Sequence, residues 1–159
     1  MALPVSWRLY RRMQDSVLAV GVLVYAGAVL DAWRVLPLAA AAKWRLTVLL
    51  PGSCLALTLL ACLLIRPVRE ALRRHLWISY RTGFGQTIIS VIGGLGLLVA
   101  VAGVIIWQSH GAAHGGRLHG GGFSGFGAGL GLLIAQTIQV RVLEHDPDLR
   151  DRMGPAGPD

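Results

Sequence analysis

Four long apolar runs, separated by charged connectors, set the strongest limit on what this chain can fold into. A transmembrane α-helix needs about 20 mostly apolar residues, and it satisfies its backbone polar groups within itself. The sequence therefore predicts an all-α integral membrane protein, with a membrane domain over residues 16–140 and cytoplasmic segments over residues 1–16 and 141–159. The four predicted transmembrane helices cover about residues 16–36, 46–65, 87–107 and 121–140.

The first run has a second interpretation, a cleaved secretory signal peptide. Ala26, Gly27 and Ala28 resemble the small-x-small site at which such peptides are cut, with Ala28 as the last residue removed. Apolar residues resume after Asp31, however, and continue through Leu36, which makes the run long enough to span a membrane. We therefore favour a retained first span and leave cleavage after Ala28 open.

The distribution of basic residues predicts how the spans are oriented. Arginine and lysine number eleven over the N-terminal segment, the central connector and the tail, against four in the other two connectors. Basic residues are retained on the cytoplasmic side, so both termini are predicted to be cytoplasmic. Their place beside apolar runs also argues against nucleic acid as a partner, although the net charge is +7. Arginine greatly outnumbers lysine, which favours a GC-rich genome and a bacterial inner membrane.

The central connector, residues 66–85, is predicted to form a short amphipathic helix on the cytoplasmic surface. Val68, Leu72 and Leu76 recur every four residues and define its apolar side. The basic side has two interpretations: a topological anchor, or a contact with anionic membrane lipid, which clusters of basic residues beside a span favour. Its arginines are Arg66, Arg69, Arg73 and Arg74.

Small residues follow one face of each of the last two spans. In lipid, glycine and alanine permit close approach of helix backbones, and residues 125–129 and 127–131 are overlapping GxxxG matches. Pairing the two faces antiparallel brings glycine against small residues and amides against amides, which predicts that the third and fourth spans touch. The packing residues are Gly93, Gly96, Ala100, Gly103, Gly122, Gly125 and Gly129, and the intramembrane polar residues are Gln86, Gln136 and Gln139.

The second span carries a proline near its start. Because proline has no N–H and disturbs the preceding turn, a kink or a loosened first turn is predicted at Pro51 and Gly52. Small and polar residues recur along this span at spacings of three and four and are predicted to face neighbouring helices. These residues are Thr47, Pro51, Cys54, Thr58 and Cys62.

The second outer connector, residues 108–120, is rich in glycine and is predicted to be an exposed, flexible loop. Its histidines, His110, His114 and His119, are weak candidates for a divalent metal site. No Cys, Asp or Glu accompanies them, and a glycine-rich loop does not fix their geometry, so we expect no stabilisation by metal. No cofactor is predicted; haem is disfavoured because no histidine lies within a predicted span.

Motifs that carry chemistry are missing from this sequence, which has no P-loop, dinucleotide-binding, serine-hydrolase, zinc-protease or paired CxxC pattern. We therefore predict that the protein is not an enzyme. The favoured function is a small integral membrane subunit, scaffold or assembly factor, associating through its glycine-rich helix faces with other membrane subunits or with itself. The alternative is a small-solute or ion-conducting protein formed by oligomerisation. Whether the glycine faces serve internal packing or association stays open.

Overall fold

The computed structural model describes residues 7–82, 85–110 and 112–145, and every element within these ranges is helical. Four helical segments are long and apolar enough to cross a membrane, which confirms the predicted all-helical class with four candidate spans. In chain order the elements are α1 (Trp7–Val35), α2 (Ala40–Trp44), the π-helical segment η1 (Arg45–Leu49), α3 (Leu50–Leu64), α4 (Arg66–Thr82), α5 (Gly85–His110) and α6 (Ala112–Glu144).

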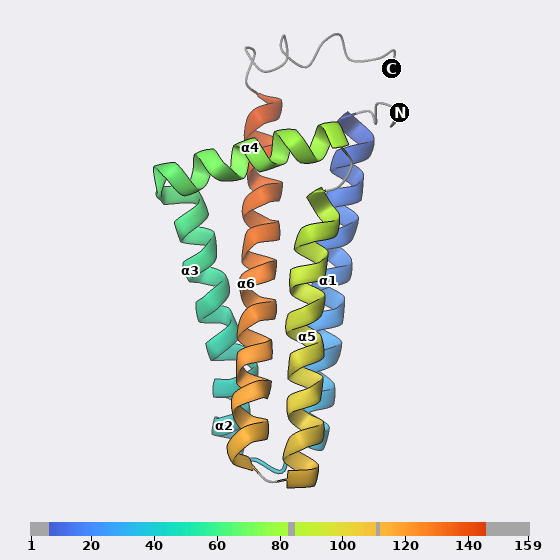
Figure 1. Ribbon diagram of the computed structural model, residues 1–159, viewed down its shortest axis with the longest axis vertical. Helices are drawn as coiled ribbons and strands as arrows, with labels where there is room; N and C mark the ends of the chain where they lie inside the picture. Colours follow the sequence, from blue (N-terminus) through green and yellow to red (C-terminus); the bar gives the residue numbers. More distant parts are fainter. Residues whose placement is uncertain (1–6, 83–84, 111, 146–159) are drawn as a thin grey trace.

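The four long segments run side by side along the length of the molecule, and α4 lies across one end of them (Figure 1). This end is termed the α4 end, and the opposite one the α2 end. α1 begins at the α4 end and α6 finishes there, so the described chain enters and leaves the bundle on the same side.

α6 is the central helix of the bundle, packed against α5, α3 and α1. Within its apolar stretch 67% of residues are buried, against 6% for α1, 17% for the α2–α3 segment and 11% for α5. The outer faces of these three neighbours carry strongly exposed leucines, among them Leu23, Leu57 and Leu98. So much contiguous apolar surface is typical of a protein whose surroundings are themselves apolar or are another protein.

Prolines and one extended residue set where the first helices end. α1 stops at Val35, shortly before Pro37, because the residue that precedes a proline disfavours helical dihedrals. Ile65 has extended dihedrals (φ −81°, ψ 108°), so the chain turns sharply between α3 and α4. α4 then crosses the bundle with Leu72 and Leu76 buried beneath it.

The structure contradicts the exposed loop that the sequence predicts over residues 108–120. α5 continues to His110 and α6 begins at Ala112, so nearly all of that segment is helical. The physical reason is close packing: a Cβ built on Gly115 would lie 2.5 Å from the Trp107 Cα of α5. Glycine's low helix propensity is outweighed where only glycine lets two helices touch and where the helix satisfies its own backbone.

The helices also extend beyond the predicted spans at other boundaries. α1 begins at Trp7, so most of the predicted N-terminal segment belongs to the first helix. α6 reaches Glu144, inside the predicted tail, and the rest of that tail after His145 lies outside the described residues. Ala28, the candidate cleavage position, lies well inside α1.

Candidate functional site

Glycine lets α5 and α6 touch backbone to backbone. A Cβ built on Gly96 would lie 2.6 Å from the Phe126 backbone nitrogen, and one built on Gly122 would lie 2.6 Å from the Ala100 Cα. Real Cβ atoms essentially never come this close to another heavy atom. Any larger residue at either position must therefore push the two helices apart.

The other packing residues named from the sequence lie at the same interface, and their distances from the opposite helix differ. Gly103 meets the α6 backbone as closely as Gly96 does. A Cβ on Gly129 would lie 3.2 Å from the Gly93 Cα, whereas one on Gly125 would lie 3.7 Å from the Gly96 Cα, which is an ordinary contact. The interface therefore brings the whole predicted set together, but only some of its members exclude a side chain.

A second glycine face of α6 packs against α3, and the sequence analysis did not separate it from the first. A Cβ on Gly127 would lie 2.8 Å from the Pro51 carbonyl carbon, and one on Gly131 would lie 2.7 Å from the Leu55 carbonyl oxygen. The second GxxxG match was the available signal, because positions 127 and 131 lie on a different side of a helix from 125 and 129. Two glycine faces explain why α6 is so deeply buried.

Hydrogen bonds toward the α2 end join α1 to the turn before Pro51. Proline has no N–H, so the Thr47 carbonyl lacks its usual helical donor four residues later. The Tyr25 hydroxyl donates to this carbonyl, and the Trp33 Nε1 donates to Thr47 Oγ1 at 2.8 Å. Lys43 Nζ in turn donates to the Trp33 carbonyl at 2.6 Å. The irregularity predicted at Pro51 takes the form of η1, directly before it.

Two of the three predicted intramembrane amides are described in full, and both are buried. Gln139 Oε1 accepts a hydrogen bond of 2.9 Å from Arg73 Nε of α4. Gln136 is fully buried, and neither atom of its amide has a hydrogen-bond partner. Gln14 of α1, which the sequence analysis did not single out, is also fully buried with an unpaired Oε1. The side chain of Gln86 lies outside the described part of the structure.

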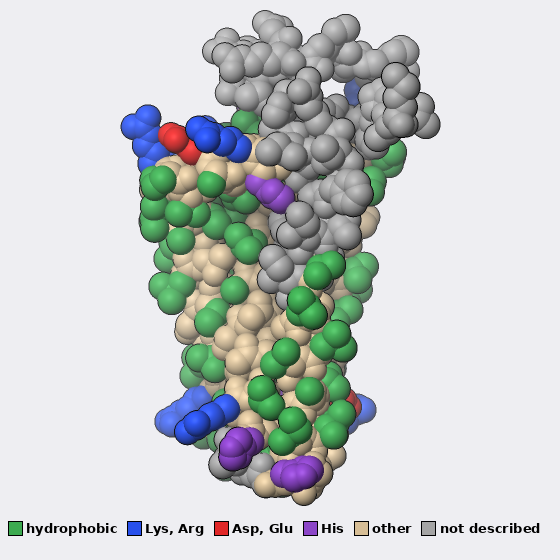
Figure 2. Space-filling model, in the orientation of Figure 1, with side chains coloured by type: hydrophobic (Ala, Val, Ile, Leu, Met, Phe, Trp, Pro, Cys, Tyr) green, Lys and Arg blue, Asp and Glu red, His purple; other side chains and the backbone are tan. Residues whose placement is uncertain are grey.

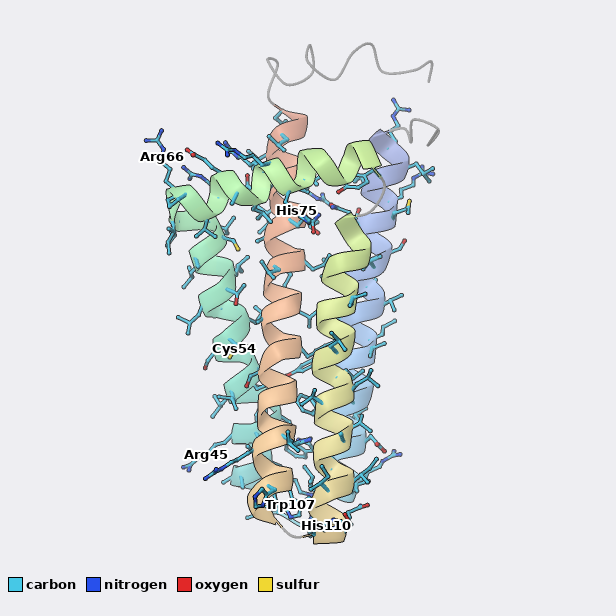
Figure 3. The ribbon with its side chains drawn as sticks, in the orientation of Figure 1. Arg45, Cys54, Arg66, His75, Trp107 and His110 are labelled. Carbon is cyan, nitrogen blue, oxygen red and sulfur yellow. The ribbon has the colours of Figure 1, made fainter. Side chains whose placement is uncertain are left out.

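The three histidines proposed as weak metal candidates are not held together. His110 is exposed at the α2 end (Figure 3), and His114, in the first turn of α6, is also exposed, whereas His119 is 1% exposed inside the bundle. His119 Nδ1 lies 3.2 Å from the Ala100 carbonyl oxygen, which can only accept, so Nδ1 carries the proton. Among the residues that the structure describes, no group of three His, Cys, Asp or Glu side chains could hold a metal ion.

The arginines proposed to contact lipid are spread along α4. Arg66 projects away from the bundle (Figure 3), and its Nε donates to Glu70 Oε1 at 3.0 Å within the helix. Arg73 and Arg74 are exposed, whereas Arg69 is half-buried. On the face seen in Figure 2, basic side chains lie at the α4 end and also at the α2 end, with hydrophobic side chains between them. Exposed pairs such as Arg66–Glu70 contribute little stability.

A groove of about 370 Å³ lies between α1, α5 and α6, in the half of the bundle nearer the α4 end. Its walls are apolar, with Gly94 on α5 and Leu133 on α6 among them. α1 contacts α6 on both sides of the groove. Toward the α2 end the rings of Tyr25 and Phe126 stack with centroids 5.6 Å apart, and toward the α4 end Tyr10 is buried in a hydrophobic cluster. α1 is therefore held firmly at these two places, and between them it meets α6 through the end of the Leu130 side chain beside the groove.

Two structural features connect this molecule to a function: the inward glycine faces and the groove beside α1. The chain matches no known protein family, no curated protein and no solved structure. A function must therefore be argued from the contacts, burial and charge of the described residues.

Proposed function

We propose that the four apolar helices span a membrane, with both termini cytoplasmic and α4 lying along the cytoplasmic surface. The support is the charge at the two ends: most basic residues of the chain belong to segments at the α4 end. Positive residues are retained on the cytoplasmic side. The arginine-rich composition favours a bacterial inner membrane as the location.

Reporter fusions test this topology. A reporter that is active only outside the cytoplasm should be active when it is fused after His110. A reporter that is active only in the cytoplasm should be active when it is fused after Asp159. The opposite pattern would invert the orientation, and cytoplasmic activity of both reporters would contradict a span formed by α6.

Within that membrane, we propose a non-catalytic role as a subunit, scaffold or assembly factor for other membrane helices. One observation carries the proposal: α6 is sealed inside the chain, while its three neighbours present long apolar faces outward. The glycine faces that first suggested association contact each other and α3 within the chain. The proposed association surface therefore moves to the outer faces of α1, α3 and α5.

The alternative of a small-solute or ion-conducting oligomer has less support. Its polar groups would have to line a path between chains, but Gln136 and Gln139 are buried within a single chain. Solute or ion flux through liposomes that contain only the purified protein would favour this alternative over association.

Purification in a mild detergent, followed by native mass spectrometry, tests the association. We expect a partner, or a second copy, in fixed stoichiometry. Leu23 on α1, Leu57 on α3 and Leu98 on α5 are exposed on three different faces and can be replaced by tryptophan one at a time. The variant on the contacted face should lose the partner, and the other two serve as controls. A monomer without a partner, or equal retention by all three variants, would contradict the proposal.

A further inference from the structure

The groove between α1, α5 and α6 opens sideways, toward the surroundings of the bundle. Val20 and Val24 of α1 and Gly94 of α5 line it and are themselves exposed. Ser16 is a polar lining residue near its end closer to α4. If the helices span a membrane, as proposed above, this opening faces the hydrocarbon region of the bilayer, and its occupant enters from the lipid.

The size of the groove decides what kind of occupant fits. The groove offers about 370 Å³, which falls within the range of small-ligand sites. An unbranched hydrocarbon chain is narrow enough to lie between α1 and the α5/α6 pair.

Ser16 lines the groove at its end nearer α4, and two buried amides lie about one turn beyond the lining residues on the same side. Gln14 lies one turn before Val17 on α1, and Gln136 lies one turn beyond Leu133 on α6; both amides are fully buried and have unpaired atoms. A buried amide without a partner is unfavourable, so polar atoms are favoured at this end and hydrocarbon along the rest. The occupant is therefore amphiphilic, with its head toward the α4 end.

Charge at the same end selects the sign of the head. Arg12 lies one turn before Ser16 on α1 and is exposed. Arg141 of α6 is also exposed, and its Nη2 lies 3.5 Å from Asp15 Oδ1 of α1. Asp15 offsets only one of the two positive charges of Arg12 and Arg141, and guanidinium groups bind phosphate oxygens well.

From these observations we infer that the groove holds one acyl chain of an anionic phospholipid, whose phosphate lies against Arg12 and Arg141. This lipid site goes beyond the proposed association: it requires that the helices span a membrane, but it requires no protein partner. It also differs from the contact between α4 and lipid suggested by the sequence, because its basic residues, Arg12 and Arg141, belong to α1 and α6.

A variant that fills the groove tests the hydrocarbon part. Gly94 lines the groove, and a Cβ built there meets no atom within 4 Å, so Gly94→Leu places a side chain in the space of the acyl chain without a backbone clash. Gly27 on α1 is equally open but does not line the groove, so Gly27→Leu is the control. Val20→Phe fills the groove from the opposite wall and guards against a folding defect specific to Gly94→Leu.

The measurement is native mass spectrometry of the full-length protein after reconstitution with phosphatidylglycerol and extensive detergent washing. The unaltered protein and Gly27→Leu should retain one lipid. Each buried methylene group contributes about a fourfold factor to binding, so displacement of several should weaken retention by Gly94→Leu and Val20→Phe at least about tenfold. Thermal midpoints close to that of the unaltered protein would establish that the variants are folded.

A charge variant tests the head group. In competition between phosphatidylglycerol and phosphatidylcholine, the unaltered protein and Arg66→Gln should prefer the anionic lipid. The double variant Arg12→Gln, Arg141→Gln should bind both lipids equally. Equal binding of both lipids by the unaltered protein, or retention of lipid by folded groove-filling variants, would overturn the inference. Neither outcome would affect the proposed association with a partner.

Discussion

The two sides of α6 are built differently. Toward α5 and α3 it presents glycines, and a Cβ on Gly122 or Gly127 would fall on the backbone of the neighbouring helix. Toward α1 it presents larger side chains: Phe126 stacks on Tyr25, and a Cβ on Gly21 of α1 would meet only the end of the Leu130 side chain, at 3.0 Å. The first side is closed, whereas the second leaves a groove of about 370 Å³.

Membrane helices have little hydrophobic force to draw them together, so the closeness of their backbones decides how firmly they pack. At positions such as Gly96, Gly122 and Gly127, glycine gives α6 and its two close neighbours a contact with no room for a side chain. Aromatic and leucine side chains hold α1 at a distance, can adjust, and leave space between them. The same central helix thus forms a close structural contact on one side and one wall of the groove on the other.

The largest expected effect is on the α5 side. Gly122→Leu should lower the free energy of unfolding by about 3 kcal/mol, because its side chain must displace the Ala100 backbone of α5. Gly121→Leu is the control, since a Cβ at Gly121 meets nothing within 4 Å. Unfolding by dodecyl sulfate in mixed micelles measures both. Equal losses for the two variants would mean that the close α5/α6 contact does not stabilise the fold.

A smaller but clear loss is expected on the α3 side. Gly127→Ala adds only a methyl group, yet a Cβ there lies 2.8 Å from the Pro51 carbonyl carbon, and backbone cannot move aside as a side chain can. We expect a loss of about 1–3 kcal/mol in the same unfolding experiment. Gly52→Ala, at an open position on α3, should be as stable as the unaltered protein or more so. A stable Gly127→Ala variant would show that α3 is held less firmly than α5.

The hydrogen bond between α4 and α6 should contribute less than either glycine contact. Removal of the Gln139 acceptor by Gln139→Leu leaves Arg73 Nε without its 2.9 Å partner. Interhelical hydrogen bonds in membranes average about 0.6 kcal/mol, so we expect a coupling of about 1 kcal/mol or less. A double-mutant cycle with Arg73→Gln measures this term. A coupling energy larger than the losses of unfolding free energy in Gly122→Leu and Gly127→Ala would make polar pairing, not backbone closeness, the main stabilising feature.

The smallest effect is expected on the α1 side. In Gly21→Ala the added methyl group meets the flexible end of Leu130, while alanine favours the helix by about 1 kcal/mol over glycine. The free energy of unfolding should therefore change by less than about 1 kcal/mol in either direction. A loss as large as that of Gly127→Ala would show that α1 packs as rigidly as α3 and α5, and would remove the contrast between the two sides of α6.

Much of the architecture follows from local sequence properties. The length of the apolar runs, the prolines and the arginine-rich connector are enough to predict four long helices. They also predict a further helix in the connector between the second and third of them. The small-residue faces of the last two spans are enough to predict which helices touch, because glycine at helical spacing leaves a surface that only another backbone fills.

The errors of prediction come from contacts between segments distant in the chain. Glycine in residues 108–120 indicates a loop when local propensity alone is considered, but it forms helix because Gly115 packs on Trp107 of α5. His119 accordingly lies inside the bundle and not on an exposed loop. Gln14 carries no pattern of its own and becomes notable only because the fold buries it.

Helix number, helix length and the distribution of charge are properties of single segments, and the residues of each segment determine them without reference to the rest. The residues of a single segment do not determine which neighbour each face of its helix contacts. Tertiary structure decided that the glycines of α6 serve two neighbours at once, and that α1 packs on α6 through larger side chains with a groove beside them. These outcomes depend on distances between backbones that meet only when the bundle is complete, and no single segment encodes such a distance.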